Sequence, residues 1–191
     1  MSTRRPPLAI VVGAVALAAA MQALSSQGMD ALARHETALT AHALSRLAKL
    51  PGVHVYGDAD PAHAADRLGV ITFNVEEHPH ALVAAILSTE FAIGVRNGCF
   101  CAQPYVMRLL GLGAADQTRW RRAQLAGDNT GRPGMVRISF AAYNESDDIE
   151  ALVEMLHRIM RHDYKGVYEQ TPESGDYRPV GYEDTMPAAF F

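Results

Sequence analysis

The chain has 191 residues, enough for one full domain. With 49% hydrophobic and 20% charged residues, its composition is typical of an ordinary globular protein. A formal net charge of −4 and a pI near 6.0 give no reason to expect a nucleic-acid-binding protein. The two cysteines, Cys99 and Cys101, are too few for a disulfide framework, so we expect a reducing, cytoplasmic compartment.

The N-terminal segment has two interpretations. Arg4 and Arg5 precede an uncharged run, Pro6 to Gln27, that is rich in Ala, Val and Leu and imitates a secretory signal sequence. The run is short for a membrane span, and we expect no membrane partner. We favour a buried Ala-rich helix that ends at Gly28, because the segment leads directly into more helix. Its surface is apolar almost all round, so this helix should pack against a partner on more than one side.

The rest of the chain alternates between helical and strand patterns. Helices are predicted over residues 29–49, 78–90, 101–112, 115–126 and 147–162. Strands are predicted over residues 53–56, 68–75, 91–96 and 135–141, with a surface loop over 57–65. The segment after Asp163 carries no clear pattern. We therefore expect an α+β fold: a small, mostly antiparallel sheet with helices packed on one face.

The segment Arg96–Cys101 (RNGCFC) is the first candidate for chemistry. A strand is expected to end in the turn Asn97-Gly98, which places Cys101 at the start of a helix, where backbone N–H groups and Arg96 favour a thiolate. This is the setting of a nucleophilic cysteine. Two alternatives remain open. Both cysteines could be small buried residues, or Cys99 and Cys101 could bind zinc together with His78 and His80.

Arg137 is the second candidate, because it interrupts the apolar strand predicted over 135–141. A charge in a strand needs a partner or an exposed edge. Its guanidinium can bind a carboxylate through two parallel hydrogen bonds. The alternative is an internal salt bridge.

Six segments, in order along the chain, resemble the C-terminal (small) domain of pyridoxal-phosphate enzymes of the cysteine desulfurase and class V aminotransferase family. They are Met29 to Glu36, Pro51 to Gly57, GVITFNV (69–75), His78-Pro79-His80, IGVRNGCFCAQP (93–104) and VRISFAAYN (136–144). The likeness runs from about Ala9 to about Met160. The CFC pattern is also similar to that of molybdenum cofactor sulfurases, since Cys99 and Phe100 replace two histidines often found before the nucleophile.

The resemblance implies roles for three residues. Cys101 corresponds to the cysteine that takes sulfur from L-cysteine as a persulfide. Arg137 corresponds to the arginine that binds the substrate's α-carboxylate, and Arg96 to a substrate-binding arginine at the mouth of the cysteine loop. The implied cofactor is pyridoxal 5'-phosphate. The family's Schiff-base lysine lies in a separate large domain, and neither Lys49 nor Lys165 matches its motif, so we assign no cofactor-binding residue and no metal ligand to this chain.

The same resemblance divides the chain into three parts. Residues 1–28 are expected to form an apolar linking helix that joins a large domain absent from this chain, residues 29–163 the C-terminal domain, and residues 164–191 a tail of unassigned structure. The implied partners are the large domain or subunit, L-cysteine or another amino acid, and a second copy of the chain in a homodimer. The alternative is a catalytically silent fragment, or a partner-binding module of the same fold.

Overall fold

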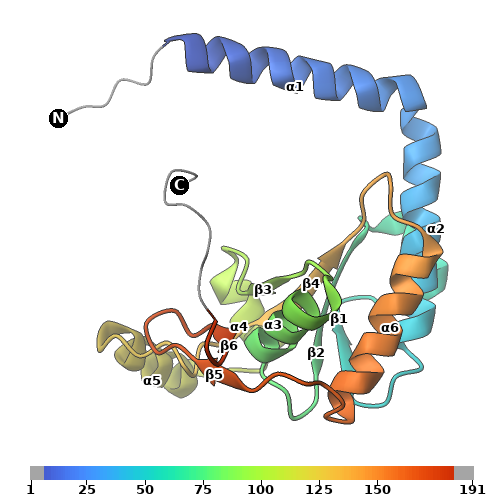
Figure 1. Ribbon diagram of the computed structural model, residues 1–191. Helices are drawn as coiled ribbons and strands as arrows, with labels where there is room; N and C mark the ends of the chain where they lie inside the picture. Colours follow the sequence, from blue (N-terminus) through green and yellow to red (C-terminus); the bar gives the residue numbers. More distant parts are fainter. Residues whose placement is uncertain (1–6, 183–191) are drawn as a thin grey trace.

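The computed structural model describes residues 7–182 and contains a four-stranded antiparallel sheet with strand order β1-β2-β4-β3. Its strands are β1 (Val53–Tyr56), β2 (Val70–Val75), β3 (Arg96–Gly98) and β4 (Met135–Ser139). The α-helices are α1 (Pro7–Gln27), α2 (Met29–Leu47), α3 (His80–Phe91), α4 (Gln103–Leu109), α5 (Ala114–Leu125) and α6 (Ser146–Met160). The expected α+β fold with a small antiparallel sheet is confirmed (Figure 1).

The hydrophobic core lies between one face of the sheet and helices α2, α3 and α6. Successive strand residues point to opposite faces, so the alternation in β2 sends Ile71 and Phe73 to one side, where both are fully buried. From β4, Val136 and Ile138 join them on that side. The period of two in these strands therefore decides which face the helices cover.

The opposite face of the sheet carries polar side chains. A row of directly paired residues crosses all four strands, because Tyr56 pairs with Thr72, Thr72 with Arg137, and Arg137 with Arg96. Directly paired residues share a face. Thr72 and Arg137 alternate with core residues along their strands, so this row points away from the core.

The strand predicted over residues 91–96 is wrong in position. Helix α3 continues to Phe91 and ends at Ala92, which has a left-handed backbone with φ of 54°, and Ile93 N donates to Leu87 O at 2.9 Å. This is a common way to end a helix. Residues 92–95 then carry the chain to the sheet, so the strand begins only at Arg96. Asn97 and Gly98, predicted as a turn, pair with β4 instead. In the loop predicted over 57–65, a short 3₁₀ helix (Pro61–Asp66) forms.

Helix α1 extends away from the rest of the chain (Figure 1). Its side chains from Val11 onward are exposed, with Val15 and Leu17 each 63% accessible. The prediction that this helix is buried is therefore wrong within this chain. The reason is that α2, α3 and α6 already cover the apolar face of the sheet. Gly28, with φ of 86°, breaks the helix as predicted. Arg4 and Arg5 lie outside the described residues.

Among residues 7–182, no single helix is both long and apolar enough to span a membrane. Val11–Gln27 and Met29–Leu47 pass that test only together, as a pair bent by 79°.

The described segment after Asp163, residues 164–182, is part of the fold. It forms a hairpin of β5 (Tyr168–Gln170) and β6 (Tyr177–Pro179) that lies beside α3. Glu90 of α3 accepts hydrogen bonds from Lys165 N, Gly166 N and the Tyr168 hydroxyl, each at 2.9 Å. The single carboxylate of Glu90 therefore attaches the start of the tail to the body of the domain.

Candidate functional site

The cysteine loop, Cys99–Cys101, joins β3 to α4. Phe100 and Cys101 both have left-handed backbones, with φ of 53° and 60°. Two consecutive residues other than glycine in this region are uncommon, because each meets steric resistance at its Cβ. Ala102 N donates to Cys99 O at 2.8 Å and closes the turn. Strained backbone of this kind concentrates at functional sites.

The prediction that Cys101 begins a helix is wrong. The helical backbone starts at Gln103, and Cys101 lies in the left-handed turn before it. The sequence suggested that a helix N-terminus would favour the Cys101 thiolate. Because Cys101 precedes the helix, it does not occupy that position. The loop still projects Cys101 toward solvent, since this residue is exposed.

The two cysteines lie in different environments. Both are free, but Cys99 is partly buried and its Sγ donates to Pro133 O at 3.1 Å. Burial raises the pKa of the Cys99 thiol above its ordinary value, against a smaller opposing effect of the Arg132 charge. Cys99 is thus a neutral thiol hydrogen-bonded to the Pro133 carbonyl, whereas Cys101 is accessible to solvent. The alternative in which both are buried is wrong for Cys101.

Arg137 contacts the cysteine loop through Phe100. The guanidinium carbon of Arg137 lies 4.9 Å from the centre of the Phe100 ring, in a cation–π contact. Its Nε is buried and has no hydrogen-bond acceptor among the described residues, and none of the ion pairs found there includes Arg137. The alternative of an internal salt bridge is therefore not observed. Nothing in the sequence indicated the contact between Phe100 and Arg137.

Arg96 lies directly opposite Arg137 in the β3–β4 pairing. Arg96 is exposed, and it too belongs to none of the ion pairs in the described part of the chain. Since directly paired residues share a sheet face, two arginines without an ion-pair partner in the described residues give this face a positive charge suited to an anion. The structure therefore places Arg96 and Cys101 in the lining of one pocket, whereas Arg137 is connected to the loop through its contact with Phe100 and does not line that pocket.

A shallow pocket of about 330 Å³ surrounds the loop. Its lining includes Arg96, Phe100 and both cysteines, together with residues that sequence reasoning had not assigned to a site: Asn97, Gly98, Gln103, Trp120, Gln124 and Arg132. The indole Nε1 of Trp120 is buried without a hydrogen-bond partner among the described residues. Trp120 lies on α5, far along the chain from the loop, so only the tertiary packing identifies it.

Residues 132–134 contact the cysteine loop and the end of β3. A Cβ at Gly134 would lie 2.6 Å from Gly98 Cα and 2.7 Å from His80 Nε2, so this close approach requires glycine. His80 Nε2 lies 3.0 Å from Arg132 O. Burial lowers the pKa of His80 despite that hydrogen bond, which favours a neutral imidazole at this position.

The zinc alternative finds no support in the described part of the chain. His78 Nδ1 lies 2.8 Å from Glu76 O, and its ring lies 4.9 Å from that of His162. His80 is occupied with Arg132, and Cys99 with Pro133. Within residues 7–182, no group of three or more His, Cys, Asp or Glu side chains is placed to hold a metal ion.

The residues of this chain do not fit pyridoxal 5'-phosphate as a cofactor held by this chain alone. That cofactor requires a lysine for its Schiff base. The two lysines, Lys49 and Lys165, are both exposed, and neither lines the pocket around the cysteine loop.

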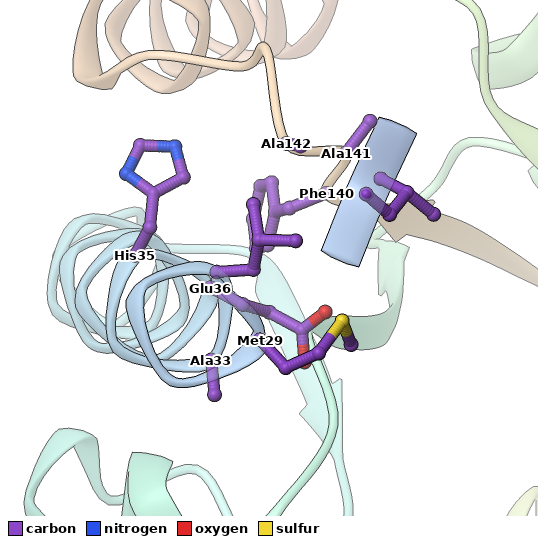
Figure 2. Close-up of a pocket in the computed structure, with 9 residues that line it drawn as sticks. Met29, Ala33, His35, Glu36, Phe140, Ala141 and Ala142 are labelled. Carbon is purple, nitrogen blue, oxygen red and sulfur yellow. The ribbon is translucent and has the colours of Figure 1, made fainter. Parts of the chain in front are cut away.

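A second pocket, of about 310 Å³, lies where α1 meets α2. Figure 2 shows Met29 and Glu36 of α2 facing Phe140 and Ala141, which follow β4. Its main polar groups are already engaged, since Gly69 N donates to Glu36 Oε1 at 3.0 Å and His35 Nε2 lies 2.8 Å from Asn144 O. The remaining lining is mostly apolar, so this is a packing surface without reactive groups.

Comparison with known proteins assigns most of the chain to one family. Residues 9–152 match the protein family described as Aminotransferase class-V. The cysteine desulfurase of Dickeya dadantii is 35% identical over 151 residues, which are 79% of this chain and 30% of that protein. A probable cysteine desulfurase of Halalkalibacterium halodurans is 37% identical over 150 residues, with 78% and 30% covered. The chain therefore spans about 30% of the length of these relatives.

Solved structures show the same fold. The apo structure of a cysteine desulfurase from Thermococcus onnurineus NA1 superimposes with a TM-score of 0.61 and 29% identity, covering 78% of this chain and 31% of the other. The cysteine desulfurase CsdA of Escherichia coli, solved as an S-sulfonic acid, gives a TM-score of 0.59 over 85% of this chain and 33% of its own. At 24% identity, the second comparison supports only the fold assignment.

Proposed function

The chain belongs to the aminotransferase class V family, and from this premise we propose that it is the C-terminal part of a cysteine-desulfurase-like enzyme dependent on pyridoxal phosphate. The observation that carries the proposal is the accessible Cys101 in a strained loop beside two arginines, Arg96 and Arg137, that have no carboxylate partner in the described residues. The relatives that support the desulfurase assignment are about three times as long as the matched region.

Each of the three residues has a proposed role. Cys101 is the sulfur acceptor, and in the net reaction L-cysteine and the Cys101 thiol become L-alanine and a Cys101 persulfide. Arg137 binds the α-carboxylate through the terminal nitrogens of its guanidinium, which belongs to no ion pair in the described residues. Arg96, on the same sheet face, adds positive charge and a second set of donors.

A large domain, on another polypeptide or another segment, would supply the lysine and the cofactor. Helix α1 is the surface proposed to meet it. Its apolar side chains are exposed in this chain, among them Val15, Leu17 and Met21 at more than 60%. A contiguous apolar surface of this kind is typical of an interaction site. In this scheme residues 1–28 form the link, residues 29–163 the domain, and the segment from residue 164 an attached tail.

The proposal is tested by combining the chain with a lysine-bearing large-domain chain of the same family, pyridoxal 5'-phosphate and L-cysteine, and measuring alanine. We expect alanine release that Cys101→Ser abolishes and that Cys99→Ser leaves largely intact. Arg137→Leu should raise the KM for L-cysteine by at least about tenfold, since a charge-assisted bidentate contact is lost. Equal activity of the wild-type and Cys101→Ser chains would contradict the role of Cys101.

Binding without turnover would favour the alternative, a catalytically silent partner-binding module. In that case a large-domain chain should bind through α1, as measured by analytical ultracentrifugation. Replacing Val15, Leu17 and Met21 by glutamine should weaken this binding, while alanine release should be absent from every combination.

A further inference from the structure

We propose that Phe100 is a positioning residue that couples carboxylate binding at Arg137 to the position of the Cys101 thiol. The inference rests on the proposed function and adds to it a residue that neither the family resemblance nor the sequence pattern assigned. Its basis is a juxtaposition: Phe100 contacts the guanidinium of Arg137 with its ring and is joined to Cys101 by its backbone.

The first half of the coupling is the contact with Arg137. An arginine side chain has several rotatable bonds, and fixing them on binding a carboxylate weakens affinity. The Phe100 ring, 4.9 Å from the guanidinium carbon, holds that group on one side and leaves its terminal nitrogens, which are not among the buried unpaired atoms, for a ligand. Arg96 directly opposite repels the guanidinium, so an attractive contact is needed to keep it in place. Phe100 is the aromatic residue found in this contact.

The second half is the backbone of the loop. Phe100 and Cys101 are consecutive left-handed residues, each held in a conformation that an unsupported loop would leave. The Ala102–Cys99 hydrogen bond and the Cys99–Pro133 hydrogen bond fix the start of the loop. The ring of Phe100 is therefore the side-chain anchor nearest to Cys101. A carboxylate bound at Arg137 restrains this guanidinium further, and through the ring it restrains the direction in which Cys101 projects.

Carboxylate bound at Arg137 should change the reactivity of Cys101, and the ring of Phe100 should be required for the change. Two variants separate the ring from the backbone. Phe100→Asn removes the ring, and asparagine tolerates the left-handed conformation better than most residues. Phe100→Tyr keeps an aromatic ring of the same size and is the matched control.

The experiment uses the complete chain, with propionate as the carboxylate probe and no partner domain. The Arg137 Nε–H signal, assigned by its loss in Arg137→Lys, is followed by NMR in the wild type and both variants. In the wild type and Phe100→Tyr it should carry the ring-current shift of a stacked aromatic, which Phe100→Asn should lose. Propionate should bind Phe100→Asn about two- to tenfold more weakly than the wild type, since the arginine is no longer pre-organised.

The second readout is the rate of Cys101 alkylation by iodoacetamide, measured by mass spectrometry with and without saturating propionate. We expect at least a twofold change in the wild type and in Phe100→Tyr, and none in Phe100→Asn at equal thermal stability. A purely structural role would not produce this pattern. If Phe100→Asn binds propionate as the wild type does and keeps the twofold change, the coupling is refuted and the proposed role of Arg137 stands. If the wild type shows no saturable shift of Arg137, both are refuted.

Discussion

Arg96 and Arg137 are directly paired residues of neighbouring antiparallel strands, and the row they belong to lies on the sheet face opposite the core. Like charges in this position repel each other and reduce stability. No carboxylate in the described residues neutralises either one. A repulsion between like charges that no nearby carboxylate compensates is typical of a binding site, where the compensating charge arrives with the ligand.

Removing one of these charges should therefore stabilise the chain. We expect Arg96→Gln to raise the free energy of unfolding by about 0.5 kcal/mol at low salt, because the repulsion between paired like charges is relieved. Arg96 is the residue to change, since Arg137 also stacks on Phe100. Urea unfolding followed by circular dichroism measures the effect.

The matched control for that experiment is Arg34→Gln, which removes an exposed arginine of α2 and should leave stability within about 0.3 kcal/mol of the wild type. Raising the salt concentration to about 1 M should remove most of the gain in Arg96→Gln, since exposed charges are screened over about 3 Å. A loss of stability in Arg96→Gln at low salt would contradict the repulsion.

The two cysteines should differ in reactivity. At pH 8 we expect iodoacetamide to alkylate Cys101 at least about tenfold faster than Cys99, because only the thiolate reacts and burial raises the pKa of Cys99. Cys99 is also shielded by its hydrogen bond to Pro133. Mass spectrometry of Cys99→Ser and Cys101→Ser gives the two rates separately. Equal rates would show that the loop does not protect Cys99.

Glu90 should attach the tail in a pH-dependent way. Partial burial would raise its pKa, but hydrogen bonds from Lys165, Gly166 and Tyr168 bring it below the ordinary value of 4.5. A lowered pKa means that the attachment is fully present above 4.5 and is lost as the pH falls through the folded-state value. Hydrogen exchange of the Lys165 and Gly166 amides measures this.

Glu90→Gln should reproduce the acidic state at neutral pH. We expect those two amides to exchange about tenfold faster, which corresponds to the loss of about 1.4 kcal/mol from charge-assisted hydrogen bonds. Glu154→Gln, a change at an exposed position of α6, is the control and should leave the exchange unaltered. Unchanged exchange in Glu90→Gln would mean that the tail is held elsewhere.

The hairpin itself should support the cysteine loop through residues 129–133. Gly175 has φ of 74° and lies against Asn129 O, so an added Cβ would displace one segment from the other. We expect Gly175→Ala to raise the alkylation rate of Cys99 several-fold, since Pro133 is held in place only a few residues away. Gly181→Ala is the control, because Gly181 has the same kind of backbone, with φ of 78°, and open space around it. Equal alkylation rates of Cys99 in the two variants would mean that backbone strain, and not the contact between Gly175 and Asn129, causes the increase.

The regular elements were predictable because their signals are local. Branched and aromatic residues over 68–75 predicted β2, found at Val70–Val75, and the acidic residues Asp147 and Asp148 at the start of 147–162 predicted the first turn of α6, found at Ser146–Met160. Both signals depend only on neighbours along the chain. The errors fall where the backbone departs from what the residue type suggests. Ala92, Phe100 and Cys101 are left-handed although none is glycine, so β3 and α4 begin later than expected.

The candidate site depends on both the local sequence and the tertiary structure. The residue types at Cys101, Arg96 and Arg137, and the motifs around them, can be read in the sequence. The pairing of Arg96 with Arg137, the stacking of Phe100 and the shielding of Cys99 by Pro133 join residues 34 to 41 positions apart. These contacts follow from strand register and from the close approach of Gly98 and Gly134, which many distant interactions specify together. The chemistry was therefore encoded locally, whereas its geometry required the folded sheet.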